Sequence, residues 1–383
     1  MAFGLSPWRF RALLGLSIFA LFLFALYNFA VFQESSAVTY EPASNTSNST
    51  SLPKVLLVSA FYPISTSNHR ASEYRQWLSV FLGQVTTEIY LFTSPGMEEI
   101  VWDLRGSRPI TVNTTYTSPF SIPPLRGRID KYVEMQGLDR RPGDHSAELY
   151  AMRNGKPFFV YEAMRNLSAE YDYAFWIDVG SWETDYGNIA WPDAMTTQEV
   201  LATGQEARDR IFIPIHALPH TTMKYWGDQL GPIDNDFSQS RSPFLPFFGL
   251  YITKMHTGSF FGGSLQALDW WQRMFYRYHD AYLSQGVFVG DDQTLANALF
   301  LLFPSHVLTV DLDVCESYQY LFTSPSDRQR MYNAWNTWDW WGFWNDKHAR
   351  QSCLTPAKAA KMMDVLKARF GQGWTPPRAT LVS

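Results

Sequence analysis

A run of 21 uncharged residues, Ala12 to Phe32, restricts the structures that the start of the chain can adopt. The run is rich in Leu, Phe and Ala, and a helix rising about 1.5 Å per residue needs about 20 such residues to cross a bilayer core. Arg9 and Arg11 precede the run, whereas the first charged residue after it is Glu34. Because basic residues mark the cytoplasmic end of a membrane span, we expect residues 1–11 to form a cytosolic tail.

A cleaved signal peptide is the alternative interpretation of this run. The apolar region of a signal peptide is usually about 7–15 residues long and is followed by a small-x-small cleavage site. Residues 12–32 are longer than that, and Ala30-Val31-Phe32 does not fit such a site. We therefore predict an uncleaved transmembrane signal anchor, which makes the chain a single-pass type II membrane protein with its folded part in the secretory lumen.

Residues 33–52 contain mainly Ser, Thr, Asn, Pro and Glu, with almost nothing to bury. Such a segment cannot offset its ordering entropy, so we predict an extended stem. The chain has four Asn-x-Ser/Thr sequons, at Asn45, Asn48, Asn113 and Asn166. One sequon alone is weak evidence because the tripeptide is common by chance, but four on the expected luminal side agree with the topology.

The remainder of the chain is long enough for one large domain or two closely packed halves. We place this luminal domain at residues 53–350 and a C-terminal extension at 351–383. The net charge of −5 and the lack of basic runs argue against nucleic acid as a partner. The two cysteines, Cys315 and Cys353, form either one disulfide bridge or two buried thiols.

Apolar runs alternate with segments of helical periodicity along this domain. Residues 54–60 predict a buried strand, 69–82 a helix and 87–93 a second strand, which is the opening of a parallel α/β sheet. We expect further strands at 109–113, 173–178, 210–214 and 307–310, helices at 264–283 and 292–303, and a helix at 146–166 interrupted near Gly155 and Pro157. Residues 219–248 predict a long loop over one face. The predicted fold is α/β, with a mostly parallel central sheet and flanking helices.

The sharpest motif is the segment 171–183, YDYAFWIDVGSWE, in which a hydrophobic strand ends at Asp178 and Gly180 follows. Ligands of open α/β sheets bind beyond the carboxyl ends of the strands. A carboxylate there can coordinate a hard divalent cation, and the cation can neutralise a diphosphate. The alternative is an Asp that merely caps the following turn, and the local sequence leaves both interpretations open.

A second motif, HTGSFFGGS at residues 256–264, precedes a predicted helix. Its glycines, Gly262 and Gly263, would let a ligand approach the backbone and the exposed amides of the helix start. A Gly-Gly pair before a helix is also a common turn, and from the local sequence we favour that simpler interpretation.

A third motif, Asp291-Asp292-Gln293, opens a predicted helix. Acidic residues stabilise a helix start through the helix dipole, so Asp291 fits a simple N-cap. Paired carboxylates at such a junction can also hold acceptor hydroxyls or act as a base.

These motifs, in this order and spacing, resemble the HtrL/YibB-like family, which is grouped with glycosyltransferases of the GT-A fold. The matching segments are NGKPFFV at 154–160, FWIDVG at 175–180, GSFFGGS at 258–264 and GDDQT at 290–294. They span roughly the central half of the chain.

The resemblance implies a GT-A-like catalytic domain with a nucleotide-sugar donor bound over the N-terminal strands. Asp178 would be the carboxylate that binds a divalent metal, Mn or Mg, and Lys156 would lie near the diphosphate. Asp291 or Asp292 would lie near the acceptor as the catalytic carboxylate. The residues implied at the donor site are Lys156, Asp178, Gly180, Gly262, Gly263 and Gln293.

The sequence departs from the usual GT-A signature Asp-x-Asp, because the residue two after Asp178 is Gly180. A single carboxylate holds a metal poorly, so either another ligand joins it or the enzyme is metal-independent. Glu183, Asp185 and His306 are candidates for the missing ligand, although we favour a packed surface histidine for His306.

We therefore expect a Golgi (or ER) glycosyltransferase that moves a sugar from a nucleotide-sugar donor to a glycan or glycoprotein acceptor. One alternative is a membrane-tethered glycoside hydrolase, which would need Asp178 or Glu183 to face Asp291 or Asp292 at about 5–10 Å. The other is a non-catalytic glycan-binding protein, for which the missing Asp-x-Asp is the best support.

Overall fold

A computed structural model describes residues 51–64, 71–139, 142–182, 187–201, 208–215, 218–233, 258–309 and 359–381. The chain divides into two units, Met1–Ser51 and Leu52–Ser383. The expected cytosolic tail and membrane anchor, most of the expected stem, and both cysteines lie outside the described residues. Of the helices that are described, none is long and apolar enough to cross a membrane.

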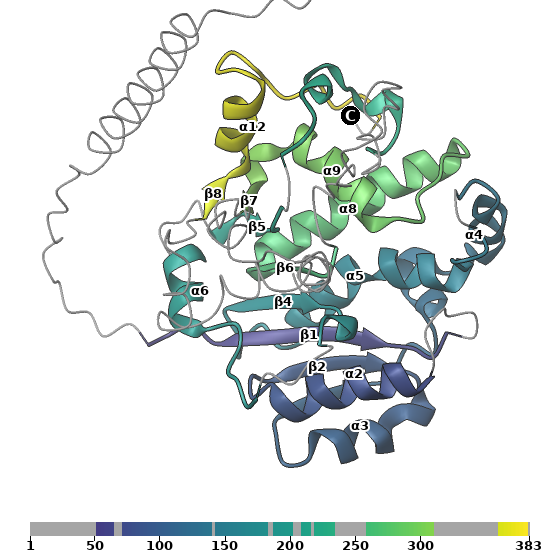
Figure 1. Cartoon of the computed structure of the whole chain (residues 1–383), viewed down its shortest axis with the longest axis vertical. Coiled ribbons are helices and arrows are strands. Elements are labelled where there is room, and N and C mark those ends of the chain that lie inside the picture. The colour runs from purple at the N-terminus through teal and green to yellow at the C-terminus, as the bar shows by residue number, and fades with distance from the viewer. Residues whose placement is uncertain are drawn as a thin grey trace, which may run out of the picture. The chain divides into compact units, whose positions relative to one another are not determined.

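Eight strands form one mixed sheet in the order β3-β2-β1-β4-β6-β5-β7-β8 (Figure 1). The strands are β1 (Val55–Phe61), β2 (Ile89–Thr93), β3 (Ile110–Asn113), β4 (Tyr173–Ile177), β5 (Ile211–Phe212), β6 (Phe260–Gly263), β7 (Val307–Thr309) and β8 (Ala360–Lys361). Strands β1 to β4 are mutually parallel, as are β5 and β7. Strand β6 is antiparallel to both β4 and β5, and β8 is antiparallel to β7. The sheet is therefore parallel in its N-terminal half and mixed beyond β4.

The described α-helices are α2 (Ala71–Gln84), α3 (Glu98–Arg105), α4 (Ile129–Gln136), α5 (Ala147–Asn166), α6 (Ala194–Leu201), α8 (Leu265–Ser284), α9 (Asp292–Leu302) and α12 (Met362–Phe370). They cover the sheet from both faces. Successive side chains of a strand point to opposite faces, and β1 follows this rule. Its residues Leu56 and Val58 belong to the core cluster that includes α5, α8 and α9, whereas Val55 and Leu57 belong to the cluster that includes α2 and α6.

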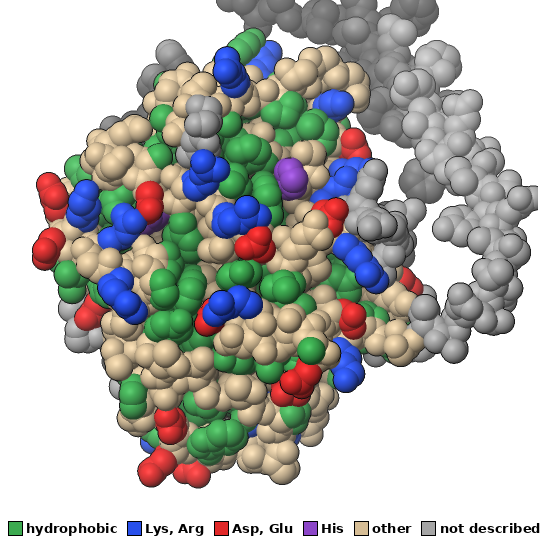
Figure 2. Space-filling view, turned by 180° about the vertical axis from the view of Figure 1, so that it is seen from behind, with side chains coloured by type: hydrophobic (Ala, Val, Ile, Leu, Met, Phe, Trp, Pro, Cys, Tyr) green, Lys and Arg blue, Asp and Glu red, His purple; other side chains and the backbone are tan. Residues whose placement is uncertain are grey.

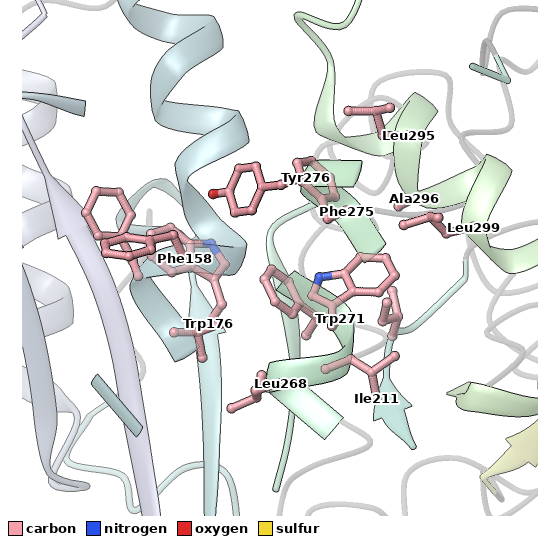
Figure 3. Packing of buried hydrophobic residues seen from close by; sticks show 14 of the residues in the cluster. Phe158, Trp176, Ile211, Leu268, Trp271, Phe275, Tyr276, Leu295, Ala296 and Leu299 are labelled. Atoms are coloured by element: carbon pink, nitrogen blue, oxygen red, sulfur yellow. The ribbon is translucent and has the colours of Figure 1, made fainter. Parts of the chain in front are cut away.

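The larger core lies between the sheet and helices α5, α8 and α9 (Figure 3). Trp176 of β4, Phe158 of α5 and Trp271 of α8 belong to it. Phe159 lies beside Trp176, with nearly parallel rings at a centroid distance of 6.2 Å. This core fixes α5 beside β4, and these two elements carry the residues of the candidate site.

Helix α5 differs from the sequence-based expectation, because it runs unbroken through Gly155 and Pro157. Proline removes one backbone hydrogen bond from a helix because it has no N–H. The carbonyl that loses its donor is that of Arg153, four residues earlier. The hydroxyl of Tyr276 donates to the neighbouring carbonyl, of Asn154, at 2.8 Å and so ties this turn to α8. The burial of α5 against the sheet and α8 outweighs the remaining cost of the proline.

The sequence does not predict strand β6, since residues 258–264 favour a turn before a helix. In the structure, Phe260–Gly263 pairs antiparallel with β4, with Gly262 opposite Phe175. A Cβ atom on Gly262 would collide with the side chain of Phe175 and the carbonyl of Ala174. The glycine therefore allows two central strands to approach closely.

Charged side chains of both signs are interspersed over the face of the molecule shown in Figure 2. The Lys and Arg side chains of the described residues on this face are scattered, alone or in small groups, among acidic, apolar and uncharged groups. This part of the surface offers no continuous basic area for a polyanion.

Candidate functional site

Four segments that are distant in the sequence meet beyond the carboxyl end of β4. The ammonium nitrogen of Lys156 lies 2.9 Å from Asp178 Oδ2 and 3.2 Å from Asp292 Oδ2. It also donates to the carbonyl oxygen of Gly258 at 2.9 Å. The backbone N–H of Asp178 donates to the carbonyl of Ser259 at 3.0 Å, which holds the loop before β6 against the end of β4. The structure thus brings together Lys156, Asp178 and Asp292, which the sequence analysis places at one site.

Each of the three side chains comes from a well-fixed element. Lys156 lies in the middle of α5, whose N-terminus is capped by the hydroxyl of Ser146. Asp178 directly follows β4, and Asp292 is the first residue of α9. Lys156 and Asp292 are almost buried, with 7% and 11% of their side-chain surfaces exposed, whereas 34% of Asp178 is exposed. Asp178 is therefore the member of this group most open to solvent.

The three N–H donors of the Lys156 ammonium all have an acceptor within the protein. Burial alone disfavours the charged form of Lys156, but the carboxylates of Asp178 and Asp292 outweigh burial and raise the pKa of Lys156 above its usual value. The lysine is therefore protonated at neutral pH. With both carboxylates ionised, the group carries one net negative charge.

Asp178 is held through both of its carboxylate oxygens. The indole Nε1 of the buried Trp176 donates to Oδ1 at 2.7 Å, and Lys156 donates to Oδ2. Asp178 precedes the short 3₁₀ helix Val179–Ser181, but its side chain makes no capping hydrogen bond to that turn. The turn-capping interpretation of Asp178 is therefore wrong for the side chain, which contacts Lys156 and Trp176 instead.

The two adjacent acidic residues at the start of α9 have different partners. Asp291 is the N-cap, and its Oδ1 accepts the backbone N–H of Gln293 at 3.1 Å. Asp292 turns toward Lys156. Asp291 therefore caps the helix and Asp292 contacts Lys156, while the expected role of either carboxylate at an acceptor stays a prediction.

Gly258 has a backbone conformation that favours glycine. Its φ angle of 67° lies in the left-handed region that L side chains rarely adopt. A Cβ atom on Gly258 would also lie 2.8 Å from Nε2 of Gln293. This backbone conformation places the Gly258 carbonyl against Lys156 and the α-carbon against Gln293, so that Gln293 lies beside the group.

The remaining predicted donor-site glycines are Gly180, Gly262 and Gly263. Gly180 lies in the 3₁₀ helix after Asp178, where a Cβ would be in ordinary contact with Trp77. Gly262 and Gly263 are buried within β6. Their predicted contact with a ligand stays a prediction.

Three buried polar residues behind the site form a network that the sequence analysis does not identify. Asn154, two residues before Lys156, donates from Nδ2 to the carbonyl of Val289 at 2.8 Å and to the hydroxyl of Tyr132 at 2.9 Å. Tyr132 is hydrogen-bonded in turn to Nε2 of His279 at 2.7 Å. Asn154 falls within the segment that resembles the family, and that is the one sequence signal for it. Tyr132 and His279 lie in no motif.

His279 is fully buried and joins this network to the surface. Its Nδ1 lies 2.8 Å from Oδ1 of Asp280, and Asp280 pairs with Arg128 at 2.7 Å. Burial lowers the pKa of His279 below its ordinary value, even though Asp280 favours the protonated form. The imidazole is therefore neutral at neutral pH.

The described residues do not fit a divalent metal ion at this site. They contain no group of three His, Cys, Asp or Glu side chains that could hold one. Asp178 and Asp292 share the Lys156 ammonium, which lies where a metal bridging them would have to bind. Two of the candidates for a further ligand, Glu183 and Asp185, lie outside the described residues.

The third candidate ligand, His306, stacks on Trp270 with a ring-centroid distance of 4.3 Å and an interplanar angle of 10°. Burial, followed by the nearby charge of Arg210, lowers the pKa of His306. This stacking agrees with the favoured interpretation of His306 as a packed histidine.

No protein-family model matches the chain, and no curated protein matches it. Solved structures similar to the chain include core-mannan synthase A from Aspergillus fumigatus in its Mn/GDP form, with a TM-score of 0.38 and 10% identity, covering 72% of this chain and 76% of that chain. Mouse xyloside xylosyltransferase 1 in its apo form gives a TM-score of 0.35 and 10% identity, covering 66% of this chain and 83% of that chain. TM-scores this low do not establish a shared fold, and the resemblance to the HtrL/YibB-like family stays a prediction.

Proposed function

We propose that the protein is a glycosyltransferase that moves a sugar from a nucleotide-sugar donor to a glycan or glycoprotein acceptor. The observation that carries this proposal is the shared contact of Asp178 and Asp292 with Lys156, at 2.9 and 3.2 Å. This contact brings Asp178, at the end of β4, next to Asp292, at the start of α9. The proposed transfer uses both carboxylates.

The position of this group in the sheet supports binding of a donor. Strands β1, β2 and β4 are parallel, and their carboxyl ends lie on the same edge as Asp178. Ligands of open α/β sheets bind beyond this edge. We place the nucleotide part of the donor over β1 and β2, with the sugar toward Asp178.

The carboxylates suit sugar hydroxyls, because a carboxylate oxygen accepts a hydrogen bond from an O–H group. Asp178 is the more exposed of the two and would bind a hydroxyl of the sugar. Asp292 would lie at the acceptor and, in an inverting transfer, take the proton of the attacking hydroxyl. Lys156 has no N–H left for a phosphate, so its role is to hold the two carboxylates together.

A glycoside hydrolase is less well supported by the same geometry. Such an enzyme needs its two carboxylates on either side of the scissile bond, at least about 5 Å apart. Here Asp178 and Asp292 both contact the ammonium of Lys156 and are linked by it.

Binding and turnover of donors test the function. The full chain in detergent is titrated calorimetrically with UDP, GDP and their sugars, and nucleotide release is followed with glycan acceptors. Binding of a nucleotide and its release on transfer support the proposal. Cleavage of an aryl glycoside without nucleotide would indicate a hydrolase, and binding of glycans alone would indicate a lectin-like protein. Asp178→Asn should abolish turnover and leave the melting temperature nearly unchanged. Asp130→Asn, which removes an exposed carboxylate of α4, is its control and should keep both.

We also propose a Golgi or ER membrane location, with a single N-terminal membrane helix and the domain in the lumen. The uncharged segment 12–32 and the four sequons support it. Endoglycosidase treatment should lower the apparent mass, and the change should shrink when Asn45 and Asn48 are replaced. An unchanged mass would place the domain on the cytosolic side.

A further inference from the structure

We propose that the ammonium group of Lys156 takes the place of a divalent cation, so that Asp178 and Asp292 bind no metal ion in the native protein. The proposal deepens the proposed function, on which its relevance to sugar transfer rests. It concerns the charge at the site and can be tested without any substrate.

The oxygens around Lys156 are spaced for an ammonium group. Asp178, Asp292 and Gly258 each contribute one oxygen, at 2.9, 3.2 and 2.9 Å from the nitrogen. These are hydrogen-bond distances, whereas oxygen ligands lie at about 2.0–2.1 Å from Mg²⁺ and about 2.3–2.6 Å from Ca²⁺. The three oxygens are of the kind that a hard cation prefers, but the protein fills the space between them with its own cation.

A metal ion and the ammonium cannot both lie between these carboxylates. Two cations a few ångströms apart repel each other strongly in a site shielded from water. Lys156 would have to withdraw, yet its side chain is 7% exposed and comes from the buried middle of α5. Withdrawal would break three charge-assisted contacts at once and leave the ammonium without acceptors.

The second oxygen of Asp178 is also engaged, because it accepts a hydrogen bond from Trp176 Nε1 at 2.7 Å. Trp176 is fully buried in the core between the sheet and α5. Chelation of a metal through both oxygens of Asp178 would therefore require the loss of this bond as well. The carboxylate is oriented by two internal donors, which replace the orienting effect of a metal.

The exchange of a metal for an ammonium changes the charge that a ligand meets. A divalent ion between two ionised carboxylates would leave no net charge, whereas Lys156 leaves one negative charge. A negative group repels phosphate and accepts hydrogen bonds from hydroxyls. Asp178 and Asp292 therefore recognise sugar hydroxyls, and the charge of a donor diphosphate is met by other residues.

The test measures metal binding by calorimetry, with the full chain in detergent and with Mn²⁺ and Mg²⁺ as the only ligands. Four proteins are compared: wild type, Asp178→Asn, Lys156→Ala and the control Lys131→Ala, which removes an exposed ammonium on α4. We expect wild type and Asp178→Asn to show the same Mn²⁺ binding, because Asp178 binds no metal ion in the wild-type protein. Lys156→Ala should bind Mn²⁺ at least about tenfold more tightly than wild type, because three oxygens that prefer hard cations are then free. Asp178→Asn in that background should remove the gain, and Lys131→Ala should show none.

Mn²⁺ binding by the wild type that disappears in Asp178→Asn would overturn the proposal. So would a folded Lys156→Ala protein that gains no affinity for either ion. If Lys156→Ala does not fold, the comparison of wild type with Asp178→Asn still decides the question. Because no sugar nucleotide is present, a protein that fails to transfer sugar gives the same metal result, and the two failures are distinguishable.

Discussion

The side-chain amide of Asn154 donates a hydrogen bond of 2.8 Å to the carbonyl oxygen of Val289. Asn154 lies two residues before Lys156 in α5, and Val289 lies three residues before Asp292 at the start of α9. One buried hydrogen bond therefore sets the distance between the helix that carries the ammonium and the helix that carries its second carboxylate. The same amide also binds Tyr132, which packs against α8 through His279.

Asn154→Ala should loosen α9 relative to α5 and lower turnover. The variant leaves the Val289 carbonyl and the Tyr132 hydroxyl without this donor, and an unsatisfied buried group costs about 1–3 kcal/mol. The free energy of unfolding, measured in urea, should fall by that amount. Because Asp292 is displaced, kcat should fall by a larger factor than KM rises. Asn188→Ala, which removes an exposed side-chain amide that accepts a hydrogen bond from Arg108, is the control and should leave kcat near wild type. An unchanged kcat in Asn154→Ala would show that Asp292 is positioned by other contacts.

Asp292→Asn and Asp291→Asn should differ in activity although the residues are adjacent. Asp292 contacts Lys156, whereas Asp291 caps α9. Replacement of a proton-accepting carboxylate should lower turnover at least about 100-fold. Asn caps a helix nearly as well as Asp, so the fall in Asp291→Asn should be much smaller. Initial rates of nucleotide release measure both, and a larger loss in Asp291→Asn would reverse the assignment.

Much of the fold follows from hydrophobic periodicity. The uninterrupted apolar runs at β1, β2 and β4 predict buried parallel strands, because such strands are covered on both faces. The helical spacing of α8 and α9 is equally clear. Strand β6 is not predicted, because two of its four residues are glycines and its pairing depends on Phe175 in a distant segment. Local patterns do not show contacts of this kind.

The site could be predicted in part. Asp178 follows a buried strand and Asp292 opens a helix, so chain position indicates both, and the resemblance indicates Lys156. Their mutual geometry could not be predicted, because it depends on the positive φ of Gly258 and on the unbroken course of α5. The structure shows Lys156 in contact with two carboxylates, and its expected place near a diphosphate stays a prediction.

The buried imidazole of His279 should make the protein less stable in mild acid. Burial lowers its pKa in the folded state, so the unfolded chain, with a pKa of about 6.5, binds a proton that the folded protein does not. This stability is fully present above about pH 6.5 and is lost as the pH falls through the folded-state pKa, at up to about 1.4 kcal/mol per pH unit. The groups facing the imidazole are Tyr132, Tyr276, Asp280 and, through Asp280, Arg128.

His279→Gln tests this pH dependence, because Gln can bond to Tyr132 but does not titrate. The free energy of unfolding of wild type, measured in urea, should fall between pH 7 and pH 5. This fall should be smaller in His279→Gln. His220→Gln, which removes an exposed imidazole, should keep the wild-type slope. Equal slopes in all three proteins would assign the acid sensitivity to other groups.

Asp228→Asn should release the C-terminal segment. Asp228 is buried beside α8, and its Oδ2 accepts the backbone N–H groups of Thr380 and Leu381 at 2.6 and 3.0 Å and the hydroxyl of Tyr278 at 3.1 Å. Burial favours the neutral form, but the hydrogen bonds from Thr380, Leu381 and Tyr278 outweigh it and lower the pKa of Asp228.

An amide at position 228 cannot accept all of these donors, and its own NH₂ group would face backbone N–H groups. The loss should be about 1–3 kcal/mol of unfolding free energy, and carboxypeptidase should then remove the last residues faster than in wild type. Asp364→Asn, which changes an exposed carboxylate in the nearby helix α12, should leave both measurements unchanged. Wild-type resistance to carboxypeptidase in Asp228→Asn would mean that the packing of Phe370 and Trp374 against the larger core is sufficient to hold the C-terminal segment in place.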